Sequence, residues 1–234
     1  MRALFKTKGT VYYGWWIVIL ASFVQFICSL LWMQSYGAYT VLLHQEFGWS
    51  MTLLSGAFAL TRLESGLLGP LQGWLVDHYG PRLILSIGLL MFGLGLVFMT
   101  QVESILVYYF DVFLISIGIS LGYFTTMVSI VNWFQRHLTK ALSCIHLGHC
   151  LGGLSVPMLA WGLEHQGWRM MAFFSGVIVL FIGIPIVQLI INRPEDIEEV
   201  MDGGLPDALS LSNKKSDTKA PSPSWKQSIR TSAF

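Results

Sequence analysis

The sequence predicts an all-α membrane protein with six transmembrane helices. Of its 234 residues, 54% are hydrophobic and only 12% are charged, whereas soluble domains carry roughly 25% charged residues. Six apolar stretches are each long enough to cross a bilayer as a helix, which takes about 20 residues. They cover approximately residues 15–42, 51–72, 83–101, 105–133, 141–161 and 170–191. Because the connections are short, consecutive helices are expected to be neighbours in space.

Charge and cysteine usage exclude several classes of protein. The net charge of +1 gives no reason to expect a nucleic-acid partner. All three cysteines lie in apolar stretches, so no disulfide framework is indicated. The first apolar stretch is too long for a signal-peptide core and has no evident cleavage site. It is therefore expected to be retained as the first membrane helix, after an N-terminal segment of residues 1–14.

The basic residues fix the expected orientation, because lysine and arginine collect on the cytoplasmic side of a membrane. The connections at 44–50, 102–104 and 162–168 contain no lysine or arginine. The opposite side carries Arg2, Lys6, Lys8, Arg82, Arg136, Lys140 and Arg193. We therefore expect a multi-pass protein of the cell (plasma or inner) membrane with both termini in the cytoplasm.

Residues 73–82, Gly-Trp-Leu-Val-Asp-His-Tyr-Gly-Pro-Arg, separate the second and third apolar stretches. They are predicted to form a short solvated loop, in which Gly80 takes a positive φ and Pro81 opens the next helix. The order of residues resembles the loop G-x-L-x-D-R-x-G-R-R between helices two and three of major facilitator transporters. His78 and Pro81 depart from that pattern. The matching residues are Gly73, Leu75, Asp77, Gly80 and Arg82. The resemblance implies a cytoplasmic motif that helps to latch the two halves of a transporter together.

Further short matches resemble the oxalate/formate-antiporter and monocarboxylate-porter branch of the same superfamily. They lie at residues 13–16, 46–50, 132–134, 167–169 and 192–196. The resemblance covers about residues 12–207 and implies the amino-terminal half of a twelve-helix fold, built as a 3+3 inverted repeat. It implies transport of a small organic anion, a monocarboxylate or dicarboxylate, by alternating access. It also implies that helices one, two, four and five line the substrate path.

The composition changes after residue 200, where Asp, Ser, Lys and Pro replace the large apolar residues. We therefore expect a transmembrane bundle at 15–192 and a cytoplasmic linker at 193–234 that resembles the lead-in to a seventh helix. The expected partners are the bilayer and a missing six-helix half, or a second copy of the chain. The alternative is a non-transporting six-span scaffold or sensor. No catalytic order or phosphate loop stands out, so neither an enzyme nor a cofactor is expected.

Three charged residues fall within the predicted spans, namely Arg62, Glu64 and Asp111. A charge in a bilayer is costly unless it is paired or faces water. Arg62 is a candidate substrate-binding residue because its guanidinium fits a carboxylate; the alternative is a structural ion pair with Asp111. Glu64 and Asp111 are candidates for carrying a coupling proton. Glu64 has the alternative role of a protonated hydrogen-bond donor between helices.

Arg62 and Glu64 are two residues apart and should point to nearly opposite faces of the second helix. The glycines at 66, 69 and 73 share the face of Arg62. Small residues let helices approach closely in a membrane. We therefore expect this face to pack against another helix.

Polar residues on the other spans complete the candidate substrate site. They are Gln34 and Tyr36 in the first span, Tyr123 and Thr126 in the fourth, and His149 in the fifth. A polar stripe on an apolar helix can face a water-filled cavity, although hydroxyls that only join helices are also common. The segment at 144–150 holds two cysteines and two histidines. One helix cannot supply a tetrahedral four-ligand cage, so no metal site is expected.

Overall fold

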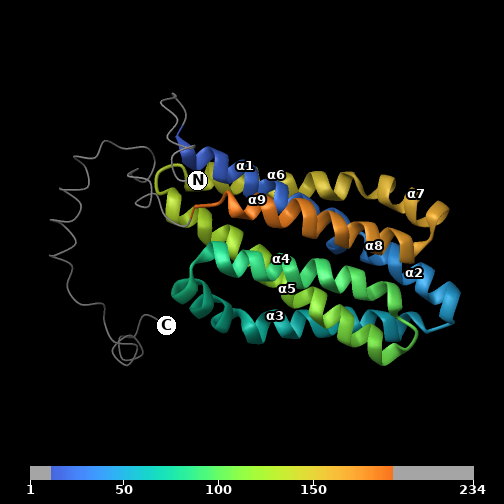
Figure 1. Cartoon of the computed structure of the whole chain (residues 1–234). Coiled ribbons are helices and arrows are strands. Elements are labelled where there is room, and N and C mark those ends of the chain that lie inside the picture. Colours follow the sequence, from blue (N-terminus) through green and yellow to red (C-terminus); the bar gives the residue numbers. More distant parts are fainter. Residues whose placement is uncertain (1–11, 192–234) are drawn as a thin grey trace, which may run out of the picture.

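The computed structural model describes residues 12–191, and the regular structure in that range is helical throughout. This confirms the all-α prediction. The helices form six long units that run side by side in one bundle (Figure 1). The units are α1 (Tyr13–Cys28) with α2 (Tyr36–Phe47), α3 (Met51–Tyr79), α4 (Pro81–Phe98), α5 (Ile105–Trp133), α6 (Leu138–Leu154) with α7 (Val156–Gln166), and α8 (Trp168–Ile178) with α9 (Ile184–Gln188). Most of the predicted N-terminal segment and the linker at 193–234 lie outside the described residues.

Five of the six units are long and apolar enough to cross a membrane. They extend over Tyr13–Phe47, Pro81–Gln101, Ile105–Trp133, Leu138–Gln166 and Trp168–Gln188. The remaining unit, α3, has 29 residues and at 1.5 Å per residue is about 43 Å long. It is more polar than the others because it carries Arg62, Glu64 and several hydroxyl side chains. It packs against α5 and runs alongside the other helices in the bundle.

Short capping motifs set the beginnings and ends of the helices. The side chains of Ser50 and Ser104 accept hydrogen bonds from the backbone N–H of Leu53 and Val107, at 3.3 and 3.4 Å. Such caps satisfy a free donor in the first helical turn. The glycines at 48, 80 and 167 follow helix ends with φ of +68°, +81° and +82°. The positive φ predicted for Gly80 is therefore confirmed.

The segment 73–82 is not the loop that we predicted. Helix α3 continues through Gly73 and Asp77 to Tyr79, Gly80 alone connects the two helices, and Pro81 is the first residue of α4. The residues at 73–79 contain no helix-breaking proline, and Gly73 is tolerated inside the helix. The expected loop is thus the last two turns of a helix followed by a one-residue turn.

Close backbone contacts at glycines hold three pairs of helices together. A Cβ atom added at Gly148 of α6 would lie 2.2 Å from the carbonyl oxygen of Ser22 in α1. One added at Gly118 of α5 would lie 2.5 Å from a backbone nitrogen of α4. One added at Gly176 of α8 would lie 2.7 Å from the carbonyl oxygen of Gly93 in α4. Glycine at these positions lets the helix axes approach more closely than any side chain would allow.

The glycine face of α3 does not form such a contact, contrary to our prediction. Within the described part of the chain, no atom lies within 4 Å of a Cβ built on Gly66 or Gly69. At Gly73 only the Phe124 ring is near, at 3.9 Å. This face of α3 is left open, and Gly69 lines a cavity instead.

At the end of the bundle without basic loops, Arg169 joins three connections between helices. Its guanidinium forms an ion pair with Glu46 at the end of α2, and the indole of Trp168 donates to the same carboxylate. Arg169 also donates to the carbonyl oxygens of Thr100 and Val102, at 3.2 and 3.4 Å. Arg169 at the start of α8 therefore connects the end of α2 with the segment between α4 and α5 at this end of the bundle. At the opposite end, Arg82 of α4 donates to the Gln188 side chain of α9 at 2.7 Å.

Candidate functional site

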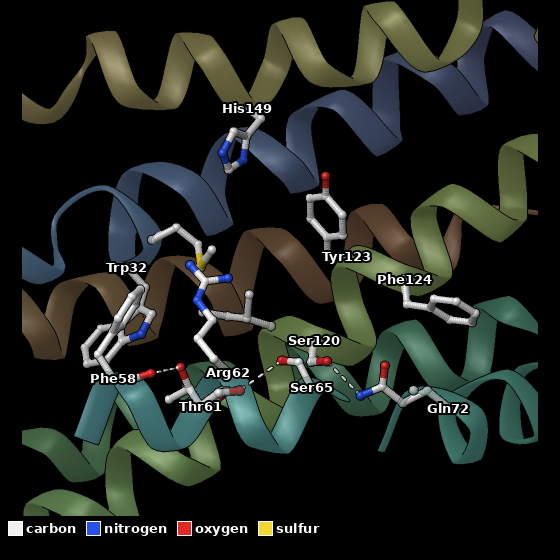
Figure 2. A pocket seen from close by; sticks show the side chains of 14 residues that line it. Trp32, Phe58, Thr61, Arg62, Ser65, Gln72, Ser120, Tyr123, Phe124 and His149 are labelled. Atoms are coloured by element: carbon white, nitrogen blue, oxygen red, sulfur yellow. Dashed lines mark hydrogen bonds between the residues drawn. The ribbon is translucent and has the colours of Figure 1, made fainter. Parts of the chain in front are cut away.

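A cavity of about 460 Å³ lies between α3, α5, α6 and the middle of the first span. The resemblance implied a substrate path lined by the first, second, fourth and fifth spans, and these four line the cavity. Figure 2 shows Arg62, Tyr123 and His149 extending into it from three different helices. The lining residues are Trp32, Met33, Phe58, Thr61, Arg62, Ser65, Gly69, Gln72, Ser116, Ile119, Ser120, Tyr123, Phe124 and His149.

A π-helical turn at Ser29–Met33 brings Trp32 and Met33 to the cavity. The backbone N–H of Gln34 donates to the carbonyl of Ser29 at 3.0 Å, five residues back instead of four. Such a turn adds one residue to the helix and is often found at functional sites. The Trp32 ring packs edge-on against Tyr36, with 5.4 Å between ring centroids.

Arg62 extends from α3 with its guanidinium carbon 4.8 Å from the centroid of the Phe58 ring, one turn earlier on the same helix. This cation–π contact holds the planar group in place. Among residues 12–191, no carboxylate lies within ion-pair distance of Arg62. The alternative of an ion pair with Asp111 is therefore wrong. The cavity has an exposed guanidinium whose hydrogen-bond donors are not used by the described chain.

Glu64 lies on the opposite face of α3, as its spacing from Arg62 predicts, and is only 4% exposed. Its Oε2 accepts hydrogen bonds from Ser116 at 2.9 Å and from Ser65 at 3.3 Å. Its Oε1 is buried and has no partner in the described structure. Asp111 of α5 is 2% exposed, and neither of its oxygens has a partner among the described residues. Both carboxyl groups therefore have buried oxygens with unused hydrogen-bonding capacity.

The other predicted binding residues fall into two groups. Tyr123 and His149 line the cavity, with 6.3 Å between their ring centroids. The Nδ1 atom of His149 is buried without a hydrogen-bond partner in the described chain. Gln34 is exposed, but the structure does not place it in the cavity lining.

Tyr36 and Thr126 lie behind the cavity wall, in the packed interior. The hydroxyl of Tyr36 donates to the carbonyl of Leu54 at 2.7 Å and is 2.8 Å from the hydroxyl of Tyr108. Thr126 accepts from the Gln25 side chain at 2.9 Å and donates to the carbonyl of Tyr123 at 2.8 Å. These contacts support the position of Tyr123 and that of Phe58, whose ring packs at a tilt against the Tyr36 ring with 4.9 Å between centroids.

Sequence reasoning missed a polar row on α3 that forms much of the cavity wall. Thr61, Ser65 and Gln72 line the cavity together with Gly69. Their spacing of four, four and three residues is that of one helix face, so this pattern could have revealed them. No such spacing indicated that Trp32 and Met33 line the cavity, because the π turn changes the α-helical periodicity of the first span at these residues.

The residues of the 73–82 motif lie at one end of α3, outside the cavity lining. Asp77 is exposed and makes no hydrogen bond or ion pair with any described residue. The neighbouring Trp74 and His78 rings stack with 5.4 Å between centroids. Gly80 forms the turn, and Arg82 contacts Gln188 as described above.

Comparison with known proteins gives one family and several distant relatives. Residues 18–226 match the family model described as Major Facilitator Superfamily. The chain is 26% identical over 191 residues to the oxalate:formate antiporter of Oxalobacter formigenes, covering 81% of the chain and 45% of that protein. It is 28% identical over 158 residues to a probable L-galactonate transporter of Escherichia coli (64% and 34%). It is 24% identical over 159 residues to the bovine monocarboxylate transporter 13 (67% and 37%). The chain thus spans less than half of each of these relatives.

Proposed function

Because the chain belongs to the Major Facilitator Superfamily, we propose that its cavity binds a small organic carboxylate and that the complete protein carries this anion across the membrane. Transport would follow alternating access, in which the site opens to one side of the membrane and then to the other. The fold that the resemblance implied, six helices forming one half of such a transporter, agrees with the family match.

The observation that carries this proposal is the exposed guanidinium of Arg62 in the cavity. It has no ion-pair partner among the described residues, and the Phe58 ring holds it in one orientation. A guanidinium can bind a carboxylate through two parallel hydrogen bonds, which gives geometric specificity as well as charge. The three relatives support the same class of substrate, since the names of all three refer to the transport of organic acids.

Ligand-induced stabilisation of the purified complete protein tests this proposal. A ligand that binds only the folded state raises the thermal unfolding midpoint. Formate, oxalate, lactate and longer carboxylates should be compared with the corresponding amides, which keep the shape but lose the charge. At least one carboxylate should stabilise the protein while its amide does not. Equal stabilisation by acid and amide, or stabilisation by amines alone, would exclude an anion site.

We further propose that a second six-helix unit completes the cavity. The open glycine face of α3 lies beside Arg62, and the chain covers only 45% of the oxalate:formate antiporter. The second unit could come from the same polypeptide or from a second copy of the chain. The molar mass of the complete protein in detergent should correspond to two six-helix units. A particle with one six-helix unit that still binds carboxylate would contradict this proposal.

Glu64 and Asp111 are our candidates for carrying a coupling proton. Their buried oxygens without partners give a proton a place to bind within the span. An inward proton gradient should stimulate uptake by the complete protein, and Glu64→Gln or Asp111→Asn should remove this stimulation while leaving exchange between two carboxylates. Stimulation that persists in both single variants and in the double variant would show that the proton travels elsewhere.

We propose that the turn at Gly80 faces the cytoplasm, because the basic residues lie at that end of the bundle. Single cysteines at His78 and Gln166, placed in a variant without Cys28, Cys144 and Cys150, can be labelled with an impermeant reagent. In intact cells the reagent should modify the site at 166 and leave the site at 78 unmodified until the membrane is opened. The reverse pattern would invert the orientation.

A further inference from the structure

We infer that the hydroxyl of Ser116 couples the binding of a proton at Glu64 to the binding of a carboxylate in the cavity. It donates to Glu64 when that group is ionised, and to the bound ligand when Glu64 is protonated. This inference rests on the proposed function, because it assumes that the ligand carboxylate lies at Arg62 and that Glu64 carries a proton. It adds the contact through which the two sites affect each other.

Glu64 is connected to the cavity by hydrogen bonds to two serines. Its own side chain is 4% exposed and does not line the cavity. Its Oε2 atom lies 2.9 Å from the hydroxyl oxygen of Ser116 and 3.3 Å from that of Ser65. Both serines line the cavity. In the described chain, a change in the hydrogen bonding of Glu64 therefore reaches the cavity through these two side chains.

The two serines differ in where else their protons can go. The hydroxyl of Ser65 also donates to the carbonyl of Thr61 at 3.0 Å, drawn as a dashed line in Figure 2. Since a hydroxyl has a single proton, this helical carbonyl can hold the Ser65 proton in either state of Glu64. Among the described residues, the hydroxyl of Ser116 has no acceptor other than Glu64. Ser116 is therefore the serine whose proton responds to the charge on Glu64.

The charge on Glu64 determines where the Ser116 proton goes. An ionised carboxylate only accepts hydrogen bonds, and a bond to a charged acceptor is about twice as strong as one between neutral groups. Ionised Glu64 therefore holds the Ser116 proton. A protonated Glu64 has lost its charge and can itself donate to Ser116. The carboxylate of a ligand is then the stronger acceptor for the Ser116 proton.

Arg62 and Ser116 can bind one carboxylate from two helices. Arg62 lies on α3 and Ser116 on α5, and both line the same cavity. A carboxylate has about four acceptor sites on its two oxygens, so it can accept from the guanidinium and from the hydroxyl together. Protonation of Glu64 thus adds a donor to the site. By reciprocity, a bound carboxylate that takes the Ser116 proton favours protonation of Glu64 by the same factor.

Other groups near Glu64 can also make carboxylate binding depend on pH. Helix α3 packs against α2, α4 and α5, and α6 lies across the cavity. Besides Arg62, Asp77 and His78 of α3, the titratable groups on these helices within the described range are Tyr36, Tyr39, His44 and Glu46 on α2, Arg82 on α4, Tyr108, Tyr109, Asp111 and Tyr123 on α5, and His137, Lys140, Cys144, His146, His149 and Cys150 on α6. The test must therefore isolate the part of the pH dependence that requires both Glu64 and Ser116.

The effect of Ser116→Ala on carboxylate binding, measured at several pH values, tests the inference. Dissociation constants for formate, lactate and oxalate should be measured with the complete protein in detergent between about pH 5 and pH 8, where ordinary carboxyl groups are mostly ionised. At the acidic end, Ser116→Ala should weaken binding at least about 10-fold, as expected for a hydrogen bond to a charged group. At the alkaline end it should bind as tightly as the unchanged protein, or more tightly.

Further variants assign the effect to the pair. In a Glu64→Gln background the neighbouring group is neutral throughout, so Ser116→Ala should weaken binding by the same factor at every pH. Ser116→Thr keeps the hydroxyl and should keep the pH dependence of the unchanged protein. Ser129→Ala is the matched control, because Ser129 is also on α5 but donates to the carbonyl of Thr125 and lies outside the cavity. It should leave binding unchanged at all pH values.

Proton uptake provides a measurement on the unchanged protein. In a weakly buffered solution, adding the ligand should remove up to about one proton from solution for each ligand bound, and Ser116→Ala should reduce this uptake. Absence of uptake over the whole pH range would overturn the inference.

The outcomes separate failure of this inference from failure of the proposed function. If Ser116→Ala has no effect, or the same effect at every pH while Glu64 is present, the inference is wrong and the carboxylate site at Arg62 remains. A pH-dependent effect that persists in Glu64→Gln would assign the proton to another group and also overturn the inference. If none of the three ligands binds, or Arg62→Ala binds them equally well, the proposed function fails and the inference fails with it.

Discussion

Replacing Arg62 by alanine should abolish uptake of carboxylates by the complete protein. The guanidinium is the fixed positive charge of the described cavity lining, and losing one partner of a desolvated charge pair costs roughly 2–5 kcal/mol. Carboxylate affinity should therefore fall about 30-fold or more. Arg62→Lys should restore little, because an ammonium on a flexible stem cannot reproduce the planar fork or its stacking on Phe58.

Lys140→Ala is the matched control for Arg62→Ala. It also removes one positive charge, but Lys140 is exposed at the start of α6 and does not line the cavity. Both variants should reach the membrane in normal amounts, and only the Arg62 variant should lose uptake in vesicles. Near-normal uptake by Arg62→Ala would show that Arg62 has no direct role in binding the substrate.

Gly148→Ala should strongly destabilise the bundle. The added Cβ would lie 2.2 Å from the carbonyl oxygen of Ser22 and 2.8 Å from its carbonyl carbon. These are backbone atoms of α1, which cannot rotate away as a side chain can. Forcing the helices apart typically costs 1–3 kcal/mol, occasionally more. The thermal unfolding midpoint in detergent, measured by the loss of the monodisperse peak after heating, should fall clearly below that of the unmodified protein.

Gly66→Ala makes the same chemical change at a helical site where no atom lies within 4 Å of the new methyl group in the described structure. Alanine is favoured over glycine within a helix by about 1 kcal/mol, so this variant should be as stable as the original or slightly more so. Equal destabilisation by the two variants would mean that Gly66 is packed in the complete protein. No destabilisation by Gly148→Ala would mean that α1 and α6 are further apart than the structure shows.

The positions of five of the helices that could span a membrane were predicted from the sequence, because they depend on the length of apolar stretches, which the bilayer constrains directly. The face of Arg62 could also be predicted, since two residues of separation from Glu64 place the two charges on different sides of one helix. The prediction for the end of α3 was wrong because an acid, two glycines, a proline and an arginine at 73–82 were interpreted as a loop, although nothing before Gly80 stops the helix.

Polarity alone did not predict which residues line the cavity. Tyr36 and Thr126 are polar, yet hydrogen bonds to Leu54 and Gln25 hold them behind the wall. Trp32 is apolar in appearance, yet it lines the cavity. Which residues of a helix face a cavity depends on packing between helices distant in the sequence, and a residue's own polarity does not determine it.

The π-helical turn at Ser29–Met33 also determines how the first span accommodates its length. Each residue of an α-helix turns the chain by about 100°, so one extra residue in a regular helix would turn everything after it by about that angle. The π turn takes up the extra residue locally, because the N–H of Gln34 bonds to the carbonyl of Ser29, five residues back. Tyr36 and Tyr39 beyond the turn are buried, and loss of one residue between 29 and 33 should leave them buried in a regular helix. The number of residues at this turn can therefore change by one without changing which residues of α2 face the interior.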